Sequence, residues 1–223
     1  MEKKNTVLLT IIAVAVLLVA VVGATFAYFT ATSTGSKTQT VKVTTDTINE
    51  STFNPGTAIT LNANLTNFGK AGEEYTGSNP GTQTGSNTAT VKFKAGSKGS
   101  ASMCYTAGLQ ITTNTFKKSS GFSSTEGPEL NITVTKNGNP IYTKLEIIGS
   151  NFTSGILYYP LSSSTSANKN PVTHKITASK NSEVTDTWKT TLAFVYESDI
   201  NQNTNAGSQF KGNIVFTKLN SCS

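Results

Sequence analysis

Short segments in which apolar and polar residues alternate most strongly constrain the fold of this 223-residue chain. Apolar residues occupy every second position of 59–65 and of 89–95. In an extended chain, this alternation turns one side of the segment toward a core and the other toward water, so it predicts β-strands. After the first 30 residues, no stretch shows a convincing 3.6-residue apolar period, so we expect few and short helices.

Further strands are expected where apolar and β-branched residues recur less regularly. These segments are 109–113, 130–135, 141–147, 155–159, 172–177, 187–196 and 212–218, whereas the short segment 41–44 alternates regularly, as 59–65 and 89–95 do. About ten strands predict an all-β fold, an antiparallel two-sheet sandwich of jelly-roll type. We expect much of the core to come from the large apolar residues Trp188, Leu192, Phe194, Ile214 and Phe216.

Two stretches are read as connections. Asn137-Gly138 lies between two strand-like runs and accepts the positive φ angles of a hairpin, although Pro140 favours a turn longer than two residues. The stretch 69–87 is rich in Gly, Ser, Thr and Asn with little to bury, and it is expected to be an exposed loop.

The first 30 residues have the grammar of a secretory leader. Lys3 and Lys4 precede a mostly apolar run, and Thr25 and Ala27 place small residues where a signal peptidase reads them. This predicts a signal peptide over 1–27, cleavage that leaves Tyr28 first, and a secreted protein of the cell surface or extracellular matrix. The alternative is an uncleaved membrane anchor, because the apolar run approaches the roughly 20 residues needed to span a bilayer.

The charged residues argue against a nucleic-acid partner. All basic residues are lysine, so the arginine fork that binds phosphate and guanine in two-point contacts is absent from the sequence. Lysines spread over strands and loops are typical of a solvated surface.

Cys104 and Cys222 can pair, because an exported chain meets an oxidising environment. Such a disulfide would close a loop of more than a hundred residues and, in the chain-entropy model, stabilise the fold by about 4 to 5 kcal/mol. Separate thiols or links between subunits are the alternatives.

Candidate catalytic residues are few, and we expect neither an enzyme nor a cofactor. His174 is the one histidine, and its strand-like surroundings favour a structural role at the border of the core, on the face of Val172 and Ile176. The acids Glu73, Glu74, Glu126 and Glu129 lie in polar stretches where solvation is expected. The stretch 199–207 imitates the start of a calcium loop but has Thr204 in place of the required glycine, so it favours Asx turns, with a looser cation site at Asp199 as the alternative.

The leader and the segments that follow it resemble a known family. Thr25-Phe26-Ala27-Tyr28-Phe29 is similar to the processing site of the TasA and camelysin group of Gram-positive bacteria, which the signal peptidase SipW cleaves. The Asn54-Pro55-Gly56 turn, the strand 59–65 with Asn67-Phe68-Gly69 after it, and the closing stretch 205–216 also resemble that group.

The resemblance implies a jelly-roll subunit of an extracellular or biofilm matrix fibre. It would assemble with copies of itself, through the extension 28–40, by donating a strand to the domain 41–223 of the next subunit. Tyr28, Phe29 and Ala31 would anchor the strand, and the membrane would hold it only until the leader is cleaved. Alternatively, the two aromatic residues mark a membrane interface. The other hypotheses are a monomeric binding or adhesion module, with a concave aromatic surface that includes Tyr105, Tyr158 and Tyr159, and a secreted hydrolase.

Overall fold

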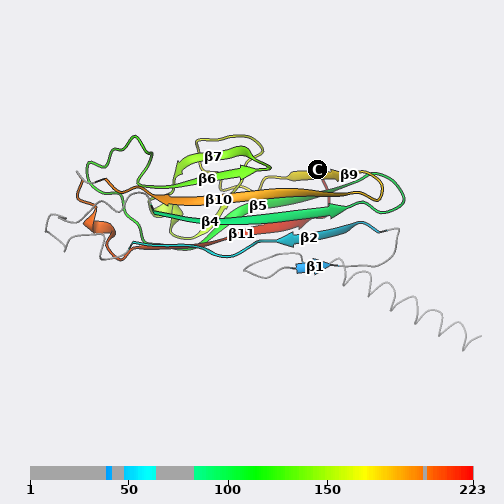
Figure 1. The fold of residues 1–223 in the computed structure, drawn as a ribbon, viewed down its shortest axis with the longest axis horizontal. Coiled ribbons are helices and arrows are strands. Elements are labelled where there is room, and N and C mark those ends of the chain that lie inside the picture. Colours follow the sequence, from blue (N-terminus) through cyan, green and yellow to red (C-terminus); the bar gives the residue numbers. More distant parts are fainter. Residues whose placement is uncertain (1–38, 42–47, 64–82, 198–199, 223) are drawn as a thin grey trace, which may run out of the picture. The chain divides into compact units, whose positions relative to one another are not determined.

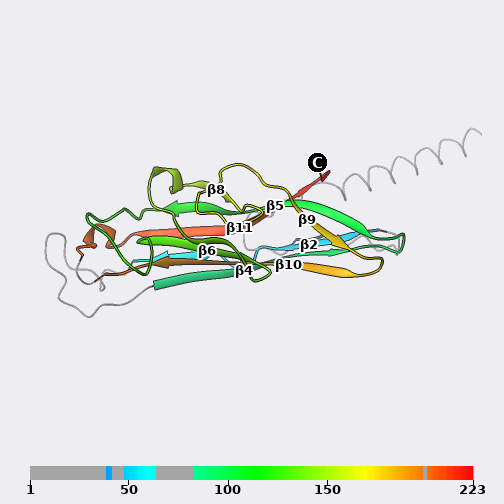
Figure 2. The same ribbon diagram turned by 90° about the horizontal axis from the view of Figure 1, so that it is seen from above.

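The computed structural model of the chain describes residues 39–41, 48–63, 83–197 and 200–222. These residues form eleven strands in two antiparallel sheets (Figure 1). The sheets pack face to face, as the view from above shows (Figure 2), so the expected all-β sandwich is confirmed. Among the same residues, no helix has the length and apolar character needed to cross a membrane.

The larger sheet has six strands. In spatial order they are β1 (Gln39–Val41), β2 (Glu50–Asn54), β4 (Gln83–Lys94), β10 (Glu183–Phe194), β6 (Leu130–Lys136) and β7 (Asn139–Glu146). The long β4 and β10 pair over their whole length, with Glu183 opposite Lys94 and Phe194 opposite Gln83. They form the centre of this sheet.

The second sheet is built around β5 (Ala101–Asn114) and β11 (Gln209–Leu219). The strand β3 (Ile59–Asn62) pairs with β11 at one edge. Two short strands share the free side of β5: β9 (His174–Ala178) pairs with its first residues and β8 (Gly155–Tyr158) with its later ones. Two short 3-10 turns, η2 (Ser150–Phe152) and η3 (Asn203–Asn205), lie in the connections.

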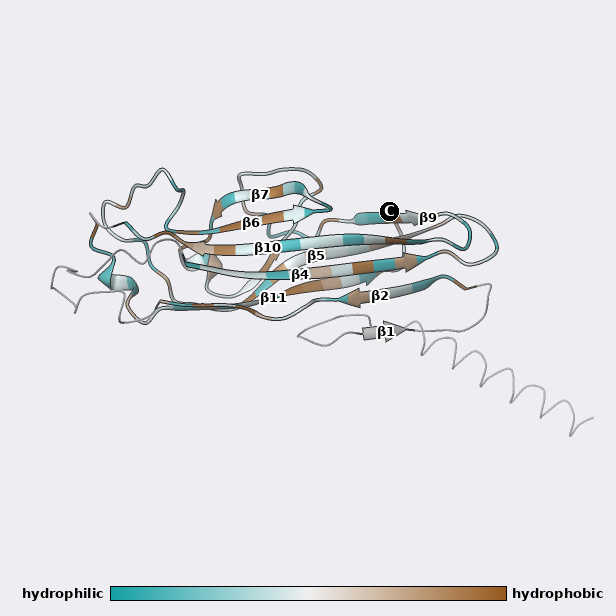
Figure 3. Cartoon of the chain, in the orientation of Figure 1, coloured by the Kyte–Doolittle hydropathy of each residue, from teal (hydrophilic) through white to brown (hydrophobic). Residues whose placement is uncertain are grey.

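The predicted alternation accounts for the core between the sheets. Along β4, Ala89, Val91 and Phe93 are buried while Lys92 and Lys94 are exposed. Figure 3 shows this alternation as brown and teal bands along the strands. The core residues expected from the sequence are confirmed, because Trp188, Leu192, Phe194, Ile214 and Phe216 are all buried.

The chain crosses from the larger sheet to the smaller one in a tight turn between β2 and β3. A side chain of β4 holds this turn in place. The Asn87 side chain, in β4, accepts a hydrogen bond from Thr57 N at 3.1 Å and donates one to Pro55 O at 2.6 Å. Gly56 has a φ of 71°, and a Cβ there would meet Asn87 Oδ1 at 2.1 Å, so only glycine fits. Residues 83–87 belong to β4, so the expectation of an exposed loop was wrong for them, and the rest of that stretch, 69–82, lies outside the described residues.

The Asn137-Gly138 hairpin is confirmed, but its turn has two residues. Lys136 pairs with Asn139, and both turn residues have positive φ, 51° at Asn137 and 82° at Gly138. The longer turn expected from Pro140 was wrong because β7 is an edge strand, where a residue without an N–H is tolerated.

Candidate functional site

The signal-peptidase residues Thr25, Ala27 and Tyr28 and the assembly anchors Tyr28, Phe29 and Ala31 lie outside the described residues. The structure does describe the end of the expected extension. Strand β1 pairs antiparallel with β2, with Thr40 opposite Thr52 and Gln39 opposite Phe53. The segment before the domain therefore contributes an edge strand to the larger sheet.

The two edges of the larger sheet differ. The β2 edge accepts a strand, since β1 adds three residues to it. The β7 edge carries Pro140, and its pairing with β6 shifts register between Ile132 and Val134 and again between Val134 and Thr135. Proline and bulges are the devices that keep edges from pairing with other chains. The β2 edge is thus better suited to strand addition.

A disulfide bond joins Cys104 to Cys222, with the two Cα atoms 5.3 Å apart. Cys104 is buried in β5 opposite Leu219, the last residue of β11. The bond ties the residues after β11 to the smaller sheet and closes a loop of 118 residues in sequence separation.

His174 lies in the core and shares its buried face with Ile176, as predicted, but it lies deeper than the core border that we expected. Its Nε2 is 2.9 Å from Tyr159 O, and its ring packs 4.9 Å from that of Trp188 and 5.6 Å from that of Tyr105, centroid to centroid. Burial lowers the pKa of His174 to about 4, so the ring is neutral at pH 7 and Nε2 donates its proton to the carbonyl. These contacts support a structural role.

Next to His174, a buried carboxylate joins the two sheets. Asp186 in β10 accepts hydrogen bonds from Tyr105 Oη at 2.6 Å and from Asn137 Nδ2 at 2.8 Å, and its Oδ2 pairs with Lys136 Nζ at 2.9 Å. Trp188 Nε1 donates to Tyr105 Oη at 3.2 Å. Burial and the neighbouring carboxylate raise the pKa of Tyr105, so its hydroxyl stays protonated and keeps donating. Both carboxylate oxygens of Asp186 therefore have a partner: Oδ2 binds Tyr105 and Lys136, and Oδ1 binds Asn137.

Glu129 is also buried, and the expectation that it is solvated was wrong. One of its oxygens accepts from Ser119 N at 2.7 Å, and the other accepts from Ser119 Oγ, Gln202 Nε2 and Asn205 Nδ2 at 2.7, 2.8 and 2.9 Å. Four donors replace the water that a carboxylate loses on burial. This carboxylate therefore holds together the loops that precede β6 and β11.

The asparagine-rich stretch before β11 supplies two of the side chains that bind Glu129. Asn203 N bonds Asn201 Oδ1 at 3.0 Å, which is one of the expected Asx turns, while Gln202 and Asn205 point inward to Glu129. Asp199 lies outside the described residues, so the alternative cation site stays untested. In the part of the chain that the structure describes, no three His, Cys, Asp or Glu side chains are grouped to hold a metal ion.

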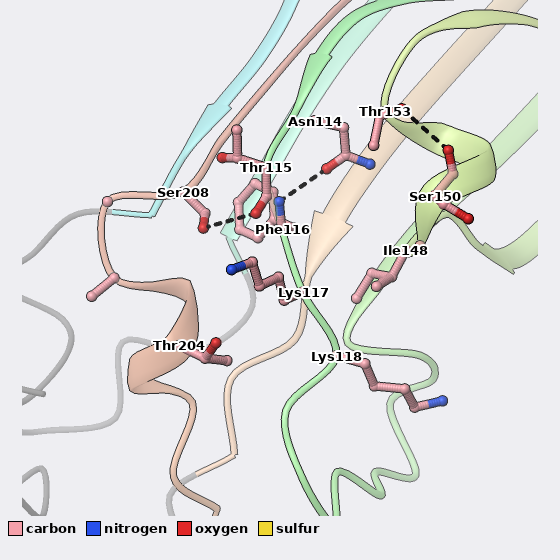
Figure 4. A pocket seen from close by; sticks show the side chains of 13 residues that line it. Asn114, Thr115, Phe116, Lys117, Lys118, Ile148, Ser150, Thr153, Thr204 and Ser208 are labelled. Atoms are coloured by element: carbon pink, nitrogen blue, oxygen red, sulfur yellow. Dashed lines mark hydrogen bonds between the residues drawn. The ribbon is translucent and has the colours of Figure 1, made fainter. Parts of the chain in front are cut away.

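A pocket of about 750 Å³ lies next to this network, and Figure 4 shows the side chains that line it. Three segments line it: the end of β5 with the residues that follow it, Asn114 to Lys118, the connection between β7 and β8 at 148–153, and the η3 loop at 204–208. This volume falls within the range of small-molecule sites, about 300 to 1,000 Å³.

The suggested aromatic binding surface is not formed. Tyr105 and Tyr159 are fully buried, and the Tyr159 hydroxyl lies 2.8 Å from Thr190 Oγ1 inside the core. Tyr158 is half-buried in β8. These tyrosines pack the sandwich, so the hypothesis of a concave aromatic surface over them was wrong.

Sequence reasoning missed the residues of the pocket and of the Glu129 network because they lie far apart along the chain. The available signal was weak: amide side chains repeat before β11, and one acid, Glu129, immediately precedes a strand. Comparisons with protein-family models, with curated proteins and with solved structures found no match for this chain.

Proposed function

We propose that this chain is a secreted, non-enzymatic structural protein that assembles with copies of itself into extracellular or biofilm matrix fibres. The single observation that carries the proposal is the pairing of β1 with β2. The end of the extension that follows the expected leader already occupies the edge of the larger sheet, and an equivalent segment from another subunit would make the same backbone hydrogen bonds.

Three further features support an assembly role. The opposite edge is blunted by Pro140 and by register shifts, which would direct strand addition to the β2 side. The disulfide suits a protein of an oxidising environment. The processing-site resemblance at Thr25 to Phe29 supports release of the segment by a signal peptidase, which would be its other partner.

The test compares a chain beginning at Tyr28 with one beginning at Lys42, which lacks β1. Size-exclusion chromatography and negative-stain electron microscopy should show filaments for the longer chain and monomers for the shorter one. A longer chain that stays monomeric at all concentrations, pH values and salt conditions would instead favour a monomeric binding or adhesion module, held at the membrane by an uncleaved leader.

A second experiment asks whether the strand pairs within or between subunits. Because Thr40 lies opposite Thr52, the double variant T40C/T52C should lock β1 onto its own β2 and prevent assembly. Mixing a T40C chain with a T52C chain should yield a covalent dimer. Filaments made of fully locked double variant would contradict strand exchange through this edge.

A further inference from the structure

The pocket next to the Glu129 network brings together exposed polar groups that have no hydrogen-bond partner among the described residues. In the described chain, Lys117 Nζ, Ser150 Oγ and Thr204 Oγ1 make no side-chain hydrogen bond or ion pair, and each comes from a different wall of the pocket. Figure 4 shows Lys117 and Thr204 on neighbouring walls and Ser150 on the wall opposite. Groups of this kind are available to a ligand.

The charge in the pocket is positive and small. The neighbouring Lys118 is engaged, because its Nζ pairs with Glu146 Oε1 at 3.0 Å. Lys117 is therefore the one cation of the pocket lining without an anionic partner in the described chain. A single ammonium group on a flexible stem binds one carboxylate as a point charge and has no fixed fork.

The walls of the pocket are held in place before any ligand arrives. Asn205 accepts from Lys117 N and donates to Lys117 O, both at 2.8 Å, and Glu129 holds Asn205 from below. On the other side, Asn114 Nδ2 donates to Ile147 O at 2.8 Å. Preorganised walls reduce the entropy lost on binding. The Lys117 side chain takes no part in these bonds, so it can be replaced without loosening the pocket.

We propose that this pocket binds an acidic sugar, a hexuronate residue of an anionic polysaccharide. The sugar carboxylate would pair with Lys117 Nζ, while its ring hydroxyls would exchange hydrogen bonds with Ser150 Oγ and Thr204 Oγ1. Half-buried Ile148 and Ala206 provide apolar surface for the face of the ring. The site would give a matrix protein a contact with acidic matrix glycan, independently of whether the protein forms fibres.

The test uses the T40C/T52C variant of the chain beginning at Tyr28, in which β1 is locked onto its own β2 and assembly is prevented. It is titrated with oligogalacturonate, with a neutral oligosaccharide of equal length and with inorganic phosphate. Amide chemical shifts from nuclear magnetic resonance report the place of binding, and calorimetry reports the affinity. Oligogalacturonate should shift the amides of 115–118, 150–153 and 204–208. K117Q should weaken binding at least about tenfold, the loss expected for a hydrogen bond to a charged group.

The matched control is K189Q, since Lys189 is an exposed lysine of β10 outside the pocket lining. It should leave the affinity unchanged. The proposal is wrong if oligogalacturonate does not bind at millimolar concentration, if the neutral oligosaccharide binds equally well, or if K117Q and K189Q weaken binding equally. Phosphate that binds more tightly than galacturonate in a Lys117-dependent way would make the pocket a phosphate site and overturn the sugar assignment.

Discussion

The Tyr105 hydroxyl donates a 2.6 Å hydrogen bond to Asp186 Oδ2, so the central strand β5 of one sheet is tied to the central strand β10 of the other. Each residue has further partners: Trp188 Nε1 donates to the hydroxyl, and Lys136 pairs with the carboxylate. A carboxylate loses its hydrogen bonds to water when it is buried, and donors of the protein must replace them. The bond from Tyr105 is one of these replacements and offsets part of the cost of burying Asp186.

Replacing Tyr105 with phenylalanine should destabilise the domain by about 1.5 to 3 kcal/mol, the usual contribution of a hydrogen bond to a charged group. The variant leaves Asp186 with one donor fewer and Trp188 Nε1 without its acceptor. Urea unfolding of wild type and Y105F measures the difference. The control is Y158F, because Tyr158 is half-buried and its hydroxyl has no bond in the described chain; its effect should stay within about 0.5 kcal/mol. Equal effects of the two variants would contradict the importance of this bond.

Stability should fall with acid below pH 6.5, in part because of His174. Burial lowers the folded-state pKa from 6.5 to about 4, with Lys136 lowering it and Asp186 and the Tyr159 carbonyl raising it by smaller amounts. Between these values the unfolded chain binds the extra proton, so the contribution is complete above pH 6.5 and is lost as the pH falls toward 4. The full loss is about 3 kcal/mol.

Protonation of carboxylates also lowers the stability of the domain in acid, so the measurement compares wild type with H174Q, which keeps the carboxylates and lacks the histidine. Urea unfolding at pH 7.5, 6, 5 and 4 should give a steeper decline for wild type than for H174Q. The two curves should converge on acidification. Parallel curves over this range would mean that the histidine is no more difficult to protonate in the fold than in the unfolded chain.

The sequence predicted well those features that depend on neighbouring residues. The alternation of apolar and polar residues predicted β4 from Ala89 onward, and Asn137-Gly138 predicted the hairpin. Both features depend only on residues that are close together in the sequence. The first part of β4, 83–88, is Gly-, Ser- and Thr-rich and becomes a strand because β10 pairs with it residue by residue. Glu129 and Asn205 meet across 76 positions, so no local pattern showed that either would be buried.

Removing the disulfide with C104A/C222A should lower the free energy of unfolding by about 4 to 5 kcal/mol, since the freed loop of 118 residues gains conformational entropy in the unfolded chain. Circular dichroism should still report a β-sheet protein, because the core between the sheets is unchanged. Urea unfolding gives the difference, and intact mass under non-reducing conditions verifies the bond in wild type. A double variant as stable as wild type would contradict a net stabilisation of the fold by this bond.

Replacing Glu129 with glutamine tests the buried carboxylate beside the pocket. The side chain keeps its size, but one acceptor oxygen becomes an amide donor that faces Ser119, Gln202 and Asn205. A donor left unsatisfied in the interior costs about 1 to 3 kcal/mol, so E129Q should lower the free energy of unfolding by about this amount. The control E183Q removes an ion pair with Lys92 that is about half exposed, and it should cost no more than about 1 kcal/mol. Hydrogen exchange should also rise at 117–119 and 202–208 in E129Q, because the loops that form the pocket lose their common anchor. Unchanged stability and unchanged exchange in E129Q would show that the carboxylate does not hold these loops.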